Sequence, residues 1–504
     1  MKQLFPVLTL LLWAAGAWSC QPSNPASDQK RPNFVFFLAD DLGWADLSCY
    51  GSSFYETPNL DRLAAEGTRF TQAYAACPVC SPTRASIMTG KYPARLDITD
   101  WIPGRQTYRA GLPQDRFLPK PFRKELPLEE ITLAEALKEA GYTTCFAGKW
   151  HIGEDSLYWP ENQGFDYNYG GWSRGAPTGK KSATEGGFFT PYQNPRLPDG
   201  PPGEYLTDRL VDESIRFLEK HRQDPFLLYL SFYTVHNPMQ GKTDKVARHE
   251  QRSLALGIPD SARFITTRDW IKKAPEGDFR ERVVQDHAIY ASMVESLDEN
   301  VGRVLDKLAE LGLSENTVVF FMSDNGGLST SEGSPTSNLP LRAGKGWLYE
   351  GGIREPMIIR WPVAAQKGMV SDVPVTSTDF YPTMLEMAGL PLKPLQHQDG
   401  ESLVPVLKGI LPPDERPIYW HYPHYSNQGG EPGSAIRKGK YKLIQLFEED
   451  RTELYDLEAD PGETRDLAEA MPGKVAEMQS LLQIWRQSLG AKMPDPNPAY
   501  LPSP

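Results

Sequence analysis

Apolar residues along the chain form short continuous runs, and amphipathic stretches separate these runs. The runs that predict buried strands lie at residues 33–39, 142–147, 226–232 and 317–322. Because these runs show little alternation with polar residues, we expect both faces of the strands to be covered. The stretches with helical spacing lie at 57–67, 131–140, 205–221 and 278–311. This succession predicts an α/β fold with one sheet covered by helices on both faces.

The pattern changes in the last hundred residues. Shorter strands are predicted at 418–422, 440–445 and 453–455, and a helix at 475–488. A chain of 504 residues is long enough for more than one domain. We therefore predict a large domain at 32–400 and a smaller unit at 401–504.

The first residues predict export. Residues 1–20 hold an apolar run after Lys2, which is too short for a membrane span and typical of a secretory signal. The run ends at Cys20 and resembles a bacterial lipoprotein signal, in which this cysteine is lipidated. Trp18 is unusual in such a signal, so plain cleavage is the alternative. Residues 21–31 are polar and predict a tether. The expected location is the periplasm, or the outer membrane through a lipid on Cys20.

Charge and cysteine content argue against two classes of protein, nucleic-acid-binding proteins and disulfide-rich scaffolds. The chain has 65 acidic and 53 basic residues and a net charge of −12, which argues against nucleic acid as a partner. Five cysteines are too few for a disulfide scaffold. No later apolar stretch is long enough to span a bilayer, so membrane attachment is expected only through Cys20.

Acidic and amide side chains follow two of the predicted strands. Asp40 and Asp41 end the first strand, and Asp324 and Asn325 end the strand at 317–322. Adjacent buried carboxylates repel each other unless a cation lies between them, although capping aspartates in a solvated loop are the alternative. Strand ends of one sheet can converge. Oxygen donors without a His or Cys pair favour Ca²⁺ or Mg²⁺ over Zn²⁺ or Cu²⁺.

The stretch from Ala75 to Arg95 carries the most distinctive chemistry. Pro82 suits the first position of a helix and Gly90 suits its C-cap, so Cys80 is predicted just before a helix N-terminus, where an anion is favoured. Arg84 adds a positive charge. Three interpretations of Cys80 remain open: a buried structural cysteine, one half of a redox C-x-x-C pair with Cys77, or a nucleophile for anionic esters.

Three further candidate catalytic residues come after predicted buried strands. Lys149 and His151 lie two residues apart after the strand at 142–147, so in an extended segment they would point the same way. His236 follows the strand at 226–232 and is a candidate general acid. An ordinary structural role is the alternative for each of them.

Several of these segments resemble the motifs of the formylglycine sulfatases. Cys80-Ser81-Pro82-Thr83-Arg84, followed by Thr89-Gly90, is similar to C-x-P-[ST]-R and T-G. Residues 148–153 match G-K-W-H-[IL]-G, and residues 341–356 match the family's L-R-x-G-K-G segment. The resemblance implies an alkaline-phosphatase-like sulfatase fold, with a large mixed sheet flanked by helices and a small C-terminal antiparallel subdomain. The chain looks most similar to arylsulfatases and N-acetylgalactosamine sulfatases of bacterial type.

The resemblance also implies a role for each matched residue. In this family a maturase oxidises the motif cysteine to formylglycine, and Cys80 holds that position. Ca²⁺ would be the metal, with Mg²⁺ less favoured, and its ligands would be Asp40, Asp41, modified Cys80, Asp324 and Asn325. Arg84 would hold the modified residue, Lys149 and Lys345 would bind the sulfate, His151 would assist the hydrated aldehyde, and His236 would protonate the leaving alcohol.

The substrate side of the prediction rests on aromatic loops. A long loop at 96–127 contains Asp100 and Trp101, and a loop of this length often lines a site. His424 lies in an aromatic stretch of the C-terminal unit. We predict that Asp100, His424 and Arg437 bind a sulfated saccharide, with subdomain packing as the alternative for the last two. The expected end group is a 4-O-sulfated galactose or N-acetylgalactosamine.

Two other functions remain possible from the sequence. A phosphodiesterase or phosphonate hydrolase of the same superfamily would share the metal site. A thiol oxidoreductase would require both Cys77 and Cys80.

Overall fold

The computed structural model describes residues 30–105, 112–265, 273–274, 277–278, 280–412 and 415–501. The predicted signal at 1–20 and the tether up to residue 29 lie outside these ranges. Among the helices in the described ranges, none is both long enough and apolar enough to cross a membrane.

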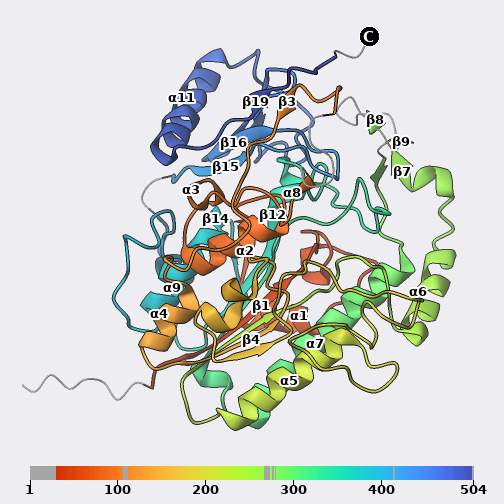
Figure 1. Ribbon diagram of the computed structural model, residues 1–504, viewed down its shortest axis with the longest axis vertical. Coiled ribbons are helices and arrows are strands. Elements are labelled where there is room, and N and C mark those ends of the chain that lie inside the picture. The colour runs from red at the N-terminus through yellow and green to blue at the C-terminus, as the bar shows by residue number, and fades with distance from the viewer. Residues whose placement is uncertain are drawn as a thin grey trace, which may run out of the picture.

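A large mixed sheet forms the centre of the molecule (Figure 1). The strand β1 (Asn33–Ala39) lies in its middle and pairs in parallel with β11 on one side and β6 on the other. The sheet order is β13-β2-β12-β11-β1-β6-β4-β5, and β14 also pairs with β2. The remaining bounds are β2 (Thr68–Tyr74), β4 (Thr143–Gly148), β5 (Tyr167–Tyr169), β6 (Phe226–Ser231), β11 (Thr317–Ser323), β12 (Arg354–Arg360), β13 (Met369–Ser371) and β14 (Val375–Thr376).

Alternate side chains of β1 belong to two apolar cores, one on each face of the sheet. Phe34, Phe36 and Leu38 pack into one core, and Val35 and Phe37 pack into the other. Both cores are fully buried at these positions, which explains why β1 has no polar alternation. The first core includes helices α2 (Cys80–Thr89), α4 (Leu133–Glu139), α9 (Phe380–Met387) and α10 (Val404–Leu407); the second includes α1 (Pro58–Glu66), α5 (Leu206–Lys220) and α7 (Ala288–Glu310).

The C-terminal part is a separate antiparallel sheet, drawn in blue in Figure 1. One face packs on α11 (Pro472–Leu489), and the other packs on residues next to α2, including Cys77 and Val79. Trp420 of this sheet donates a hydrogen bond from Nε1 to the Ala75 carbonyl at 2.8 Å. Its strands are β15 (Ile418–Tyr422), β16 (Gly433–Lys438), β17 (Tyr441–Leu446) and β18 (Arg451–Asp456).

The remaining elements are short or peripheral. They are α3 (Pro93–Leu96), α6 (Thr243–Ala255), α8 (Glu350–Ile353), β3 (Phe117–Leu118), β7 (Phe264–Ile265), β8 (Lys273–Ala274), β9 (Gly277–Asp278), β10 (Glu281–Arg282) and β19 (Asp495–Pro496).

Several helices, α2 and α7 among them, begin at other residues than predicted. α2 begins at Cys80, so Pro82 is its third residue and Cys80 lies inside the helix. A proline costs little there, because the first four N–H groups of a helix have no intrahelical acceptor. α7 begins at Ala288, ten residues after the predicted start, because Arg282 instead pairs with Phe264 in β7 and donates its backbone N–H to Ser329.

Candidate functional site

The predicted site residues meet at one edge of the large sheet. Asp40 and Asp41 follow β1, Asp324 and Asn325 follow β11, and Lys149 follows β4. β1, β6 and β11 run parallel, and β4 runs parallel to β6, so their carboxyl ends lie on the same side. Asp41 donates its backbone N–H to Asp324 Oδ1 at 3.2 Å, and Asn325 Nδ2 donates to Asp41 Oδ1 at 2.8 Å. The predicted convergence of these four side chains is confirmed.

Asp40 pairs with two cations. Lys149 Nζ lies 2.8 Å from both carboxylate oxygens of Asp40, and Arg84 Nη2 lies 3.6 Å from Oδ1. All three side chains are buried. β4 ends at Gly148, whose positive φ turns the chain and brings Lys149 to this carboxylate. Only glycine fits at this turn, because a Cβ there would lie 1.8 Å from the Ser231 carbonyl oxygen.

Asp41 has a second set of partners. Lys345 Nζ lies 2.6 Å from Oδ1, and His236 Nε2 lies 3.6 Å from Oδ2. Burial opposes ionisation of Asp41, but the positive charges of Lys345 and Lys149 outweigh this effect and hold its pKa below the usual value. The carboxylate is therefore ionised near neutral pH, as a metal ligand must be.

Arg84 is fixed from three directions. Its Nε donates to Asp324 Oδ2 at 2.8 Å, and its Nη1 donates to the Lys149 carbonyl at 2.8 Å and to Ser231 Oγ at 2.6 Å. Ser231 is the last residue of β6 and was not predicted as part of the site. A polar residue closing an apolar strand is the signal that could have identified it, as it did for Asp40 and Asp324.

Cys80 lies against His151. The two atoms Cys80 Sγ and His151 Nδ1 are 3.3 Å apart, and His151 Nε2 donates to the Ile102 carbonyl at 2.5 Å. With its proton on Nε2, the ring accepts at Nδ1 from the thiol. Burial raises the pKa of the Cys80 thiol. A neutral thiol is a weak nucleophile, so the cysteine as encoded is poorly suited to attack an ester.

The geometry that brings Lys149 and His151 together differs from the prediction. Both reach the site, but the segment is not extended, because His151 has a φ of 59°. Gly175 packs on the outer side of this ring: a Cβ at Gly175 would lie 2.2 Å from His151 Cε1. Gly175 was also not predicted, and nothing in its local sequence marks it.

His236 is neutral in this structure. Its Nδ1 donates to the Asn237 carbonyl at 2.8 Å, which leaves Nε2 facing Asp41. Burial and the neighbouring charge of Lys345 lower its pKa to about 3. Its predicted role as general acid stays a prediction.

The donors fit a hard divalent cation. Ligand atoms of Asp40, Asp41 and His236 all lie within 4.8 Å of one another. Asn325 is fully buried, and its Oδ1 has no hydrogen-bond partner although its Nδ2 has two. A buried carbonyl oxygen without a partner is costly and is the kind of ligand that Ca²⁺ uses. Asp40, Asp41, Asp324 and Asn325 could hold such an ion.

The three predicted substrate residues are buried, and each of them is bonded to other groups of the protein. Asp100 accepts a hydrogen bond from Tyr422 at 3.0 Å, and His424 Nε2 lies 2.8 Å from Thr99 Oγ1. Arg437 contacts Tyr74 and Gln72. These residues are buried because the C-terminal sheet packs on the large domain, and polar side chains of the two parts bond to each other at this boundary. The geometry thus favours the packing alternative for His424 and Arg437 and extends it to Asp100.

Asp100 should make stability depend on pH. Burial raises its pKa to about 7. The unfolded chain would ionise near pH 4, so the stability associated with neutral Asp100 is lost as pH rises from about 4 to about 7. We expect the stability of Asp100→Asn relative to the wild type to rise by about 2–3 kcal/mol between pH 5 and pH 8. Melting curves across this range would measure it.

Asp97→Asn is the matched control for this prediction. Asp97 lies three residues earlier and bonds Lys492 at the surface at 2.7 Å. Asn tolerates its left-handed φ of 57°. We expect the difference in melting temperature between Asp97→Asn and wild type to stay constant with pH. A constant difference for Asp100→Asn as well would mean that Asp100 is charged in the fold.

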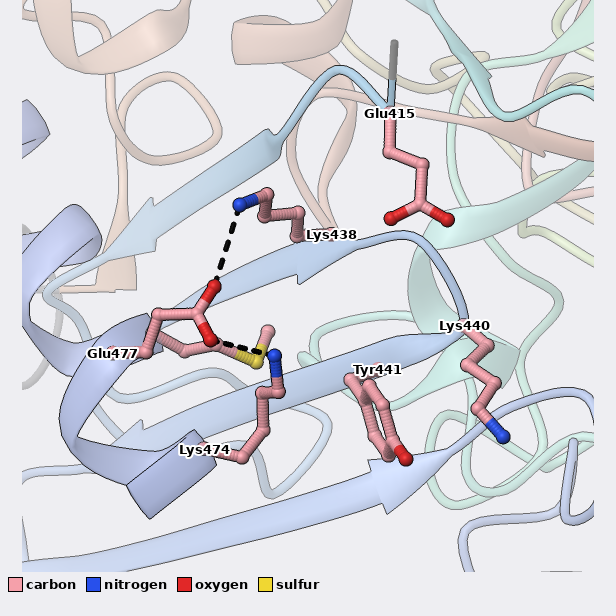
Figure 2. Close-up of a pocket in the computed structure, with 7 residues that line it drawn as sticks. Glu415, Lys438, Lys440, Tyr441, Lys474 and Glu477 are labelled. Atoms are coloured by element: carbon pink, nitrogen blue, oxygen red, sulfur yellow. Dashed lines mark hydrogen bonds and ion pairs between the residues drawn. The ribbon is translucent and has the colours of Figure 1, made fainter.

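A surface hollow of about 210 Å³ lies on the C-terminal subdomain, outside this site (Figure 2). Its three lysines are paired with carboxylates: Lys438 and Lys474 with Glu477, and Lys440 with Asp456. We assign this hollow no role.

The large sheet gathers carboxylates and cations at its strand ends, beside a buried cysteine at the start of α2. Such a set of groups suits an enzyme that hydrolyses anionic esters. The chain belongs to the sulfatase family, which it matches over residues 32–390. Residues 343–488 also match the C-terminal region described as that of N-sulphoglucosamine sulphohydrolase. The predicted family, the α/β sulfatase fold and the activity as a sulfuric ester hydrolase are thereby confirmed. This membership supports ester hydrolysis rather than thiol redox chemistry.

Relatives resemble the chain over most of its length. A sulfatase of Formosa agariphila is 30% identical over 90% of this chain and 89% of its own. The N-acetylgalactosamine-6-sulfatase of Rattus norvegicus is 33% identical over 87% of this chain and 74% of its own. The crystal structure of Ps i-CgsB in complex with k-i-k-neocarrahexaose has a TM-score of 0.72 and 28% identity, covering 90% of this chain and 93% of that one.

Proposed function

We propose that this sulfatase removes sulfate from a saccharide, using Ca²⁺ and a formylglycine that a maturase makes from Cys80. The observation that carries the proposal is the position of Cys80, at the start of α2 and against His151, beside the carboxylate and lysine cluster. As encoded, its Sγ stands where the oxygens of a hydrated aldehyde would lie. Such a hydrate supplies an oxygen nucleophile, which a buried neutral thiol does not.

The charged groups of the site favour binding of a metal cation, and the site with its cation would favour binding of the anionic sulfate. Asp40, Asp41 and Asp324 are balanced by Arg84, Lys149 and Lys345, so these six side chains sum to zero. A divalent ion would raise the total to +2 and take over the carboxylates that the lysines now contact. When bound, Ca²⁺ would polarise a sulfate oxygen. The freed Lys149 and Lys345 could then donate to the negatively charged sulfate, as preorganised donors do.

The other side chains would orient the reaction. Arg84 is fixed by Asp324, Ser231 and the Lys149 carbonyl, so it holds its neighbours in place with little freedom. His151 would accept or return a proton at residue 80 through Nδ1. His236 Nε2 would first gain a proton beside the negatively charged sulfate, and would then donate that proton to the leaving alcohol.

The saccharide is proposed from the relatives and the aromatic loops. One relative is named N-acetylgalactosamine-6-sulfatase, and one solved structure is a complex with k-i-k-neocarrahexaose. We keep a galactose-type end group as the proposed substrate, with sulfate at O4. The proposed location is the periplasm or the outer membrane, with a lipid on Cys20, and no nucleic acid partner.

The experiment combines mass measurement with a substrate screen. Protein made in a host with a maturase should show a mass loss at Cys80 that matches conversion of the thiol to an aldehyde. It should hydrolyse an aryl sulfate and one member of a panel of 4-O- and 6-O-sulfated galactose and N-acetylgalactosamine. Faster turnover of a phosphodiester than of any sulfate ester would instead identify the phosphodiesterase alternative.

Metal removal gives a separate prediction. We expect EGTA to lower kcat/KM by at least about a hundredfold, because charge stabilisation in such sites typically contributes this much, and added Ca²⁺ to restore it. The melting temperature should fall by only a few degrees, since the carboxylates keep Arg84, Lys149 and Lys345 as partners. Full activity after exhaustive chelation would exclude the metal.

A further inference from the structure

The carboxylate of Glu332 lies at the rim of the site, where no motif predicted a functional residue. Asn237, which follows His236, donates from Nδ2 to Glu332 Oε2 at 3.2 Å and to its carbonyl at 3.3 Å. Gln428 donates from Nε2 to Glu332 Oε1. Glu332 itself is exposed. Two amides from distant parts of the chain thus hold one solvent-facing carboxylate.

The support behind Glu332 is buried and connected. Gln428 Oε1 accepts from Ser426 Oγ at 2.5 Å, and the Gln428 carbonyl accepts from Thr330 and from Trp347 Nε1, both at 2.9 Å. Glu332 has a φ of 54°, a conformation that a residue with a side chain adopts at some cost. The carboxylate is therefore held in one place rather than free to move.

This support also lies against the lysine that would bind sulfate. Gly346 follows Lys345, and a Cβ at Gly346 would lie 2.0 Å from Ser426 Oγ and 2.8 Å from Gln428 Oε1. Burial lowers the pKa of Lys345, but Asp41 and other negative groups, including Glu332, raise it overall. Glu332 thus lies between the His236 side and the Lys345 side of the site.

A fixed carboxylate beside an anion site prefers hydroxyl groups to a second negative group. It carries about four acceptor positions and no donor, and the amides use two of them. It can accept from sugar hydroxyl groups, and it repels a second negative group placed near it.

We propose that Glu332 binds hydroxyl groups of the sulfated sugar and disfavours a second sulfate on that side of the ring. The inference rests on the proposed function and makes Glu332 a specificity-determining residue. The preferred substrate is then a monosulfated sugar with free hydroxyl groups beside its sulfate ester.

The test compares Glu332→Gln with wild type on three probes. These are 4-nitrophenyl sulfate, which has no sugar hydroxyl, the monosulfated N-acetylgalactosamine that wild type turns over best, and its 4,6-disulfated counterpart. We expect kcat/KM to change by less than about threefold on the aryl sulfate and to fall at least about tenfold on the monosulfated sugar. The ratio of disulfated to monosulfated turnover should rise at least about tenfold. Glu458→Gln, at an exposed glutamate of the C-terminal subdomain, is the control.

The outcomes separate the two proposals. Equal changes on all three probes, or none, with an active wild type would overturn the role of Glu332 alone. A modified wild-type protein that hydrolyses no sulfate ester would overturn the proposed function and this inference with it. Because Glu332 is exposed, an unchanged melting temperature should accompany the specificity change, and Gln428→Leu should reproduce part of it by releasing the carboxylate.

Discussion

Cys80→Ala should lower sulfate ester hydrolysis by at least about four orders of magnitude in kcat, because it removes the only proposed nucleophile. The fold should persist, since alanine is a strong helix former at the first position of α2, and the hydrogen bond to His151 is the one that the cysteine side chain makes among the described residues. Initial rates on an aryl sulfate, with circular dichroism as a check on folding, would measure this. Retention of more than about one hundredth of the activity would contradict the proposed chemistry.

Cys77→Ser is the matched control, because the two cysteines stand three residues apart. Cys77 is buried in the apolar cluster beneath the C-terminal sheet, and burial raises its pKa well above the usual value. On the sulfatase interpretation this variant keeps its activity once folded, with some loss of stability. Loss of activity in both variants without unfolding would revive the C-x-x-C redox interpretation.

Lys442→Met should give the largest loss of stability, about 3–5 kcal/mol. Lys442 Nζ lies 3.0 Å from Glu350 Oε1 and 2.8 Å from Glu463 Oε1, and all three side chains are fully buried. Methionine keeps the length of the side chain but removes the cation that both buried carboxylates share, and among the described residues only Glu350 keeps another cation, Arg354 at 3.5 Å. This network joins the C-terminal sheet to α8, so we expect the subdomain to melt first. Thermal unfolding followed by tryptophan fluorescence would detect it.

The size of this loss should depend on pH. Burial raises the pKa of Glu463 to about 7, above its unfolded value near 4.5. In the wild type, the stability associated with neutral Glu463 is therefore lost as pH rises from about 4.5 to about 7. Because the charge of Lys442 lowers this pKa, its removal makes ionised Glu463 still more costly, and the Lys442→Met defect should be larger at pH 8 than at pH 5. Lys440→Met, two residues away, removes only an exposed pair with Asp456 and should have no measurable effect. Adding Glu463→Gln to Lys442→Met should reduce the loss of stability at pH 8. An equal loss in this double variant would contradict the role of Glu463.

The centre of the fold could be predicted because burial on both faces leaves a clear pattern. β1 was predicted at its exact residues, and β6 and β11 within one residue, since continuous apolar runs of this length occur in covered sheets. The helix ends were harder. α7 starts at Ala288 because the segment before it binds residues far away in sequence, which no local pattern records.

Some residues of the candidate site could also be predicted from the sequence, and others could not. Asp40, Asp41, Asp324 and Asn325 could be predicted because a polar group that ends a buried strand needs a partner. Lys149 and His151 were assigned correctly to one place but through the wrong geometry, since a turn rather than an extended strand brings them there. Ser231, Gly175 and Glu332 were missed. Asp100, His424 and Arg437 were placed at the substrate because aromatic surroundings look alike at a binding loop and at a packed domain boundary.

The packing of the C-terminal sheet on the segment before Cys80 has a consequence for biosynthesis. Ribosomes make Trp420 and its strand some 340 residues after Cys80, yet that strand supplies the cover over Ala75, Cys77 and Val79. While synthesis proceeds, this cover does not exist and the segment stays open. Once the last strands dock, Cys80 is only 3% exposed. On the proposed function, the order of translation limits the time in which a maturase can reach Cys80, and a chain that completes its fold first would keep an unmodified and inactive cysteine.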